Sequence, residues 1–341
     1  MNARVVVILV VLLAVLGGGA LFYQHQERAR RPENVGTLGR TLFKELKAAD
    51  IAAIRITEPN ATLTIQRKDD RWVIAERADF PADVAKVREF VLKVIGLKVG
   101  QSEPLGEKDR ARLNLDTSGT QVAFLGAEDK PIGTLIVGRR YFKREVENPE
   151  KTRADGRFVA LPAEAGTAYL VGDPLTQATV KTAEWIDRAS FQVEKVKMLQ
   201  VRHPDGDAWR IERPADNADW RLAGAKPGEK LDVSRANAAS YSLQLLELAD
   251  IAPKDAKDTG LETPISVEAT TLEGANYSIK VGKLAGENHY VSFSASGLKP
   301  DAKDAERVKV LSQHVLLIPK GKLEDTIKKR AELLEKQDKK K

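Results

Sequence analysis

The sequence of 341 residues contains no cysteine. This absence excludes disulfides, thiolate metal ligands, cysteine nucleophiles and a lipoprotein anchor. It also favours an oxidising, extracytoplasmic compartment, where a stray thiol is a liability.

A strong charge of one sign is also missing from the body of the chain. The formal net charge is +6, but most of it comes from residues near the amino terminus and from residues 323–341. The rest of the chain is close to neutral and has no cluster of positive charge that could bind a polyanion, so we expect no nucleic-acid partner. Hydrophobic content of 42% and charged content of 30% are typical of a globular protein, and the length allows two domains.

One long apolar run begins at Val5 and ends at Tyr23. Its length matches the hydrocarbon core of a bilayer, which predicts a single membrane-spanning helix. A cleaved signal peptide is the alternative, with Gly18 and Ala20 as small residues before the cut. The arginines after the run favour a cytoplasmic body under the positive-inside rule, whereas the missing cysteines favour a periplasmic one, which we predict.

Two stretches of the chain repeat one pattern of alternating apolar and polar residues, at a period of about 145 residues. Such alternation predicts half-buried strands. In the first copy the pattern runs through Ile51, Ile54, Ile56, Leu63, Ile65, Trp72 and Val73, and in the second through Val196, Leu199, Val201, Trp209, Ile211, Trp220 and Leu222. Later strands are expected at residues 122–125, 134–138, 157–161 and 169–171, and at 267–270, 278–282, 289–293 and 315–318.

A helix is expected between the early and late strands of each copy. Its apolar stripe is Val84, Val87, Val91 and Val94 in the first copy, and Ala238, Tyr241, Leu245 and Leu248 in the second. After the helices, Leu113, Asn114 and Leu115 align with Gly260, Leu261 and Glu262.

We therefore predict an α+β protein, in which a transmembrane helix precedes two tandem related units of antiparallel sheet with packed helices. The predicted parts are residues 1–23 as anchor, 24–50 as a helical linker around Leu38, Leu42 and Leu46, 51–180 and 181–325 as the two units, and 326–341 as a lysine-rich tail. The tail is expected to be solvated and partly helical, and a contact with anionic lipid or wall polymer is the alternative.

The stretch before the second copy reads Trp185, Ile186, Asp187, Arg188, Ala189, Ser190 and Phe191. Together with the tandem layout, it resembles the bacterial family known as domain of unknown function 4340, whose members pair a membrane helix with tandem β-rich units. The family's genes often lie beside an ABC-type permease and a gliding-associated export component. The resemblance implies an accessory envelope role and transfers no catalytic residues.

Motifs for catalysis or metal binding are weak. The histidines, His25, His203, His289 and His314, lack ligand spacing. A hairpin turn is predicted at Asp205, Gly206 and Asp207, and another at Asp155 and Gly156. Ser296 and Lys299 match Ser-x-x-Lys without its companion motifs. We expect no catalytic residue, metal, cofactor or small-molecule substrate.

An insertion distinguishes the first copy. Val159 follows Gly138 by 21 positions, whereas Val291 follows Gly282 by 9. The extra residues are expected to form a long hairpin loop, either solvated or partner-binding. The candidate partner-binding residues are Arg139, Arg140, Tyr141, Phe142, Lys143 and Arg144. The acidic residues Glu145, Glu147 and Glu150 follow them, around Pro149.

The functional hypothesis is a non-enzymatic, membrane-anchored accessory or scaffold protein of the cell envelope, held in the inner membrane with its bulk in the periplasm. Its expected partners are the membrane and an ABC-type permease or another envelope protein. Two alternatives remain: a binding module for periplasmic polysaccharide or peptidoglycan, and an envelope enzyme with dispersed carboxylates.

Overall fold

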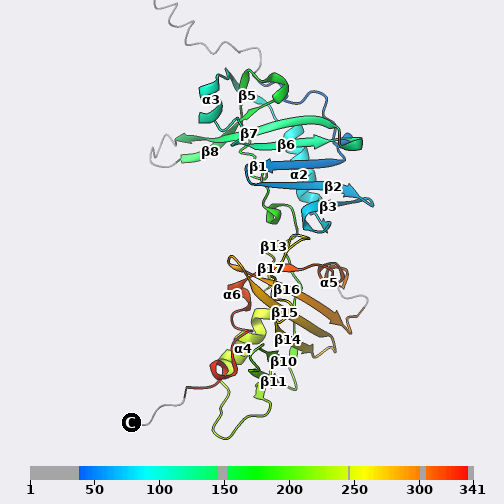
Figure 1. The fold of residues 1–341 in the computed structure, drawn as a ribbon, viewed down its shortest axis with the longest axis vertical. Coiled ribbons are helices and arrows are strands. Elements are labelled where there is room, and N and C mark those ends of the chain that lie inside the picture. Colours follow the sequence, from blue (N-terminus) through cyan, green and yellow to red (C-terminus); the bar gives the residue numbers. More distant parts are fainter. Residues whose placement is uncertain (1–37, 145–151, 245, 300–304, 337–341) are drawn as a thin grey trace, which may run out of the picture. The chain divides into compact units, whose positions relative to one another are not determined.

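Two large antiparallel β-sheets make up most of the computed structural model, which describes residues 38–144, 152–244, 246–299 and 305–336 (Figure 1). The predicted α+β class is wrong, because the described chain is mostly β and its helices are short. The α-helices among the described residues are α2 (Val84–Ile95), α3 (Glu107–Arg112), α4 (Val233–Tyr241), α5 (Ala305–Leu311) and α6 (Lys320–Leu323).

The predicted membrane helix, from Val5 to Tyr23, lies outside the described residues. Within the residues that are described, no helix is long and apolar enough to cross a membrane. The described part of the predicted helical linker, residues 38–50, contains a 3₁₀ turn at Ala48–Asp50 and no α-helix. Leu42 is nevertheless buried, and its N–H donates to the Leu97 carbonyl at 2.8 Å.

Contacts divide the chain into two compact units. The first unit comprises Met1–Thr62 and Arg88–Val180, and the second comprises Leu63–Val87 and Lys181–Lys341. All four tryptophans, Trp72, Trp185, Trp209 and Trp220, therefore belong to the second unit.

The first sheet has nine strands in the order β4-β3-β2-β1-β6-β7-β8-β9-β5. Their bounds are β1 (Ala53–Glu58), β2 (Ala61–Lys68), β3 (Arg71–Ile74), β4 (Phe80–Pro81), β5 (Val99–Pro104), β6 (Thr120–Leu125), β7 (Pro131–Arg144), β8 (Thr152–Ala160) and β9 (Thr167–Val171).

The second sheet has eight strands in the order β12-β11-β10-β14-β15-β16-β17-β13. Their bounds are β10 (Val196–Arg202), β11 (Ala208–Glu212), β12 (Arg221–Leu222), β13 (Asp250–Ile251), β14 (Ile265–Thr271), β15 (Asn276–Ala285), β16 (Asn288–Ser296) and β17 (Leu316–Pro319).

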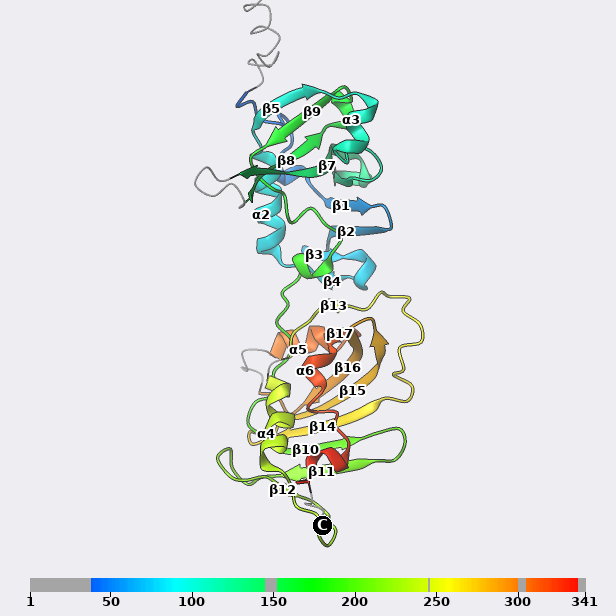
Figure 2. The same cartoon turned by 90° about the vertical axis from the view of Figure 1, so that its left-hand side faces the viewer.

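The two sheets share one strand order. With β4 set aside, β3, β2 and β1 correspond to β12, β11 and β10, the run from β6 to β9 corresponds to the run from β14 to β17, and β5 corresponds to β13. In both sheets a helix follows the first strands along the chain, and each helix lies beside its own sheet (Figure 2).

The apolar side of α2 explains why this helix forms and where it packs. Val87, Phe90, Val91 and Val94 are buried, and the Phe90 ring stacks with that of Phe124 on β6 at a centroid distance of 6.2 Å. The Asp83 carboxylate accepts from two backbone N–H groups of the first turn and caps the helix. Val84, predicted to be part of the stripe, is 57% exposed.

The second sheet packs its core around Phe191, whose ring stacks on Phe293 at 3.8 Å. The helix α4 begins at the N-cap Asp232 and buries small residues, Ala236, Ala239 and Ser240. The predicted stripe is wrong for α4, because the helix ends at Tyr241 and that side chain is 61% exposed. Of the predicted stripe, Leu245 lies outside the described residues.

Candidate functional site

A glycine on β7 lets another segment of chain cross the strand at very short range. A Cβ at Gly138 would lie 2.3 Å from the carbonyl oxygen of Leu113, a distance that side chains do not tolerate. The next residue, Arg139, donates its N–H to the same carbonyl at 2.7 Å. The crossing coincides with a register shift between Val137 and Arg140, a β-bulge that redirects the end of the strand.

The second unit repeats this crossing. A Cβ at Gly282 would lie 2.2 Å from the carbonyl oxygen of Thr259, and the N–H of Lys283 donates to that carbonyl at 2.8 Å. The left-handed residues Asn114 (φ 53°) and Gly260 (φ 72°) follow the two carbonyls. Leu113 therefore corresponds to Thr259, and the predicted alignment of Leu113 with Gly260 is wrong by one residue.

Beyond the bulge, β7 and β8 form what we call the cationic hairpin, residues 139–144 and 152–157 (Figure 1). The predicted long loop is wrong at these positions, because all six candidate partner-binding residues lie on β7. They are Arg139, Arg140, Tyr141, Phe142, Lys143 and Arg144. Glu145, Glu147, Pro149 and Glu150 lie outside the described residues. Asp155 and Gly156, predicted as a turn, are part of β8.

Like charges face each other across this hairpin. Arg140 is in register with Arg157, and Lys143 is in register with Arg153. Asp155, at the second register shift, has an interaction partner of its own. In the described part of the chain, no ion pair joins an acidic side chain to Arg139, Arg140 or Arg157.

Arg157 is the most unusual of these cations. Burial first, and then the charge of Arg140, lower the pKa of its guanidinium below the usual value. Its Nε is buried and has no hydrogen-bond partner among the residues that the structure describes. Arg140, by contrast, is exposed.

The aromatic residues of the hairpin occupy different faces. Tyr141 packs edge-on against Phe158 with ring centroids 6.2 Å apart. Phe142 is 52% exposed, and strand alternation places it on the same face as Arg140.

The second unit neutralises the cation that matches Arg139. Lys283 pairs with Asp258 at 3.2 Å. In the first unit the position that matches Asp258 is occupied by Arg112, which pairs with Asp109 instead. The acid is therefore missing from the first unit where the second unit has one.

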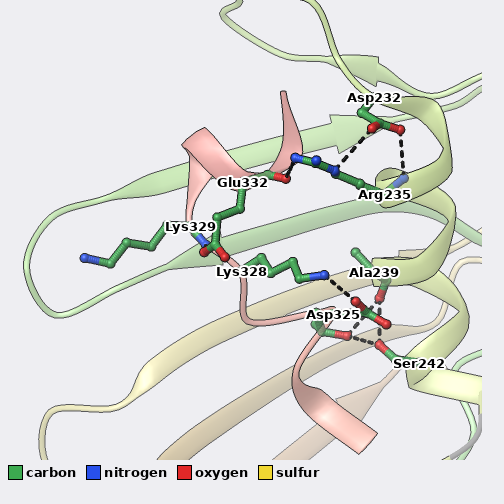
Figure 3. Close-up of polar contacts among 9 residues, drawn as sticks. Asp232, Arg235, Ala239, Ser242, Asp325, Lys328, Lys329 and Glu332 are labelled. Atoms are coloured by element: carbon green, nitrogen blue, oxygen red, sulfur yellow. Dashed lines mark hydrogen bonds and ion pairs between the residues drawn. The ribbon is translucent and has the colours of Figure 1, made fainter. Parts of the chain in front are cut away.

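A second polar cluster surrounds the C-terminal segment, residues 325–335 (Figure 3). The predicted solvated tail is wrong for this segment, because Thr326 and Leu333 are fully buried. Arg235 on α4 donates to the carbonyl of Leu334 at 3.1 Å, and Trp209 donates to the carbonyl of Lys328 at 2.6 Å.

Ion pairs hold the C-terminal segment to neighbouring turns. Lys329 pairs with Asp205 at 2.5 Å. Arg330 makes two bonds to Glu229, at 2.6 and 3.2 Å, and both side chains are largely buried. Hydrogen bonds from Arg330 and from the Lys226 backbone lower the pKa of Glu229 to about 2. These contacts hold the C-terminal segment against the turns around Asp205 and Glu229.

The other predicted motifs are dispersed. His203, His289 and His314 contact backbone carbonyl groups, and His25 lies outside the described residues. Across the described ranges, no group of three or more acidic or histidine side chains is arranged to hold a metal. Asp205 and Gly206 form the predicted β10–β11 turn. Ser296 and Lys299 are exposed at the end of β16.

A cavity of about 340 Å³ lies in the second unit beside the β2–β3 turn. Lys68, Asp69, Arg71 and Asp79 supply its charged lining, and Lys68 already pairs with Asp79 at 2.6 Å. This mixed and partly compensated lining favours no single class of ligand.

The stretch that resembles the family junction is a packed connection. Trp185 and Ile186 are fully buried. The Asp187 carboxylate accepts from the N–H of Ala189 at 2.9 Å and from Arg307 at 2.5 Å. The junction is therefore part of the core of the second unit.

Two sheets of one strand order, linked by a buried junction, define a tandem β-sheet protein. The chain belongs to the family described as a domain of unknown function, DUF4340, whose model matches residues 72–264, more than half of the chain. Neither the comparison with curated proteins nor that with solved structures finds a match.

Proposed function

We propose that this protein is a non-enzymatic accessory or scaffold protein of the bacterial cell envelope, and that the cationic hairpin holds its protein partner. The partner that we propose is an ABC-type permease or another envelope protein on the periplasmic side of the inner membrane. This choice follows the gene neighbourhood that the family resemblance implies.

A difference between the two matching sheets carries the proposal. The strand β7 has 14 residues, whereas its counterpart β15 has 10. The β15–β16 hairpin closes at the pair Ala285 and Asn288, whereas β7 and β8 still pair at Arg144 and Thr152. The additional strand residues are not needed for the shared fold, so a role in contact with another molecule explains their presence.

The composition of the additional residues supports a protein partner. Tyr141 is 38% exposed and Phe142 is 52% exposed, and both lie among arginines. Aromatic residues and arginine are enriched in protein interfaces.

The proposal is tested by shortening the hairpin. Tyr141 and Gly156 face each other in register, so an Asn-Gly turn can replace residues 142–155. The core residues Val137 and Val159 are left in place, and we expect the variant to fold with an unchanged circular dichroism spectrum. Crosslinking in native membranes should recover the partner with the natural chain and lose it with the shortened one.

A matched control alters the second sheet. Replacing Gly286 and Glu287 by Asn-Gly changes the corresponding turn without changing its length. This variant should retain the partner. Equal recovery with the shortened hairpin would contradict the proposal, and retention of the natural chain on insoluble peptidoglycan, independent of the hairpin, would favour wall binding instead.

A further inference from the structure

We infer that the cationic hairpin binds a carboxylate-rich segment of a protein partner, with Arg140 and Arg157 as the ion-pairing residues and Phe142 as the apolar contact. The inference rests on the proposed function, because it names the chemistry of the partner at the same site.

The first argument is the pairing of like charges. Directly opposed residues of antiparallel strands have Cβ atoms about 4.5–5.5 Å apart, and like charges at that distance are destabilising. The hairpin holds such a pair in Arg140 and Arg157, which face each other in register. Carboxylates supplied from outside would turn this repulsion into attraction.

The second argument comes from the internal repeat. At the matching crossing in the second unit, Lys283 has its own acid, Asp258, at 3.2 Å. The first unit has Arg112 in place of that acid, so Arg139 adds to the positive charge at the base of the hairpin. The same fold thus neutralises its cation in one unit and leaves it available in the other.

The third argument concerns Arg157 itself. Its side chain is partly buried, and its buried Nε has no hydrogen-bond partner among the described residues. A partly desolvated guanidinium gains most from a carboxylate, which accepts two parallel hydrogen bonds from the planar fork.

The geometry favours an extended protein segment over a lipid surface. Arg140, Arg157 and Phe142 share one face of the hairpin, which a strand-like segment can follow.

The test measures binding of the full chain to a fluorescein-labelled peptide of alternating glutamate and leucine, by fluorescence anisotropy. A peptide with glutamine in place of glutamate is the ligand control. The variant Arg140→Gln with Arg157→Gln should weaken binding at least about tenfold, the loss expected for two charge-assisted hydrogen bonds. It should also flatten the dependence of the affinity on salt.

The protein control removes two exposed cations of the second sheet, by Arg221→Gln with Lys280→Gln. This variant should bind the glutamate peptide like the natural chain. Undiminished binding by the hairpin variant, or equal loss in the control, would overturn the inference. So would a preference for phosphatidylglycerol vesicles over the peptide that depends on Arg140 and Arg157.

The outcomes separate this inference from the proposed function. If the shortened hairpin loses the crosslinked partner but the double arginine variant keeps it, the accessory role stands and the acidic partner is wrong. If the double arginine variant loses the peptide, but both this variant and the shortened hairpin still recover the crosslinked partner, the acid-binding site stands and the proposed role of the hairpin is wrong.

Discussion

The N–H of Arg139 donates to the carbonyl of Leu113 at 2.7 Å, at the point where a connecting segment crosses β7. The second unit has the same bond, from Lys283 to Thr259 at 2.8 Å. In both units the preceding residue is a glycine, because the carbonyl occupies the space that a side chain would need. The crossing is therefore a shared structural device that redirects one strand of each sheet.

We predict that Gly138→Ala and Gly282→Ala each destabilise their unit by about 1–3 kcal/mol or more, as overpacking of a close contact does. Urea unfolding followed by circular dichroism measures the loss. Tryptophan fluorescence should follow the change for Gly282→Ala, since Trp209 lies on β11 of the same sheet as Gly282. Gly172→Ala is the control, because nothing lies within 4 Å of its added Cβ. Equal effects at all three glycines would contradict the argument.

The repulsion between Arg140 and Arg157 predicts a mutation that stabilises the protein. Arg140→Gln removes one of the two facing charges and should raise the free energy of unfolding by about 0.5 kcal/mol. Hydrogen exchange of the amides in β7 and β8 measures the change locally. Arg139→Gln is the control, because Arg139 lies in the bulge without a cross-strand partner in register. Faster exchange in Arg140→Gln would show that the arginine stabilises the hairpin.

Alternation of apolar residues predicted most of the strands. The expected strand at residues 122–125 is the end of β6, and that at residues 278–282 lies within β15. The class was wrong because the two large sheets outweigh the helices. The first predicted helix is present as α2, whereas the second is shorter than the pattern indicated. Around α4 the heptad-like spacing of Tyr241 and Leu248 continued past the end of the helix, and the true buried positions are alanines, whose small side chains give a weak apolar signal.

The candidate site was only partly predictable. Counting positions after Gly138 located the insertion. The β-bulges between β7 and β8 have no sequence signal, so the pairing of the two strands beyond Gly138 could not be predicted, and Arg139 to Arg144 were expected in a loop. The like-charged pairs depend on cross-strand register, which no local pattern specifies. The burial of the C-terminal segment was missed because its apolar residues, Leu333 and Leu334, are few and stand among lysines.

The C-terminal segment should be essential to the second unit. Leu333 is fully buried, and Leu333→Ala is expected to cost about 2–5 kcal/mol of stability, as truncation of a core leucine does. Leu334→Ala, one residue further on at a half-buried position, should cost clearly less. Urea unfolding followed by tryptophan fluorescence compares the two. Similar small effects of both substitutions would mean that the segment does not close the core.

The ion pair of Arg330 with Glu229 makes the closure of this segment sensitive to acid. Two hydrogen bonds from Arg330 join the guanidinium to this carboxylate, at 2.6 and 3.2 Å. Hydrogen bonding to Arg330 and to the Lys226 backbone lowers the pKa of Glu229 from 4.5 to about 2. Because the folded pKa lies below the unfolded one, the pair stabilises the second unit fully above pH 4.5, and this stabilisation is lost as the pH falls towards 2.

We therefore predict that Glu229→Gln destabilises the second unit at pH 6. The difference in free energy of unfolding between the variant and the natural chain should shrink as the pH falls from 4.5 to about 2, because the natural carboxyl becomes protonated in this range. Urea midpoints from tryptophan fluorescence at each pH measure this difference, in which the titration of all other carboxylates cancels. Glu262→Gln, at an exposed position, should show no such trend. A difference that stays constant from pH 6 to 2 would mean that Glu229 stabilises the fold by packing rather than by its charge.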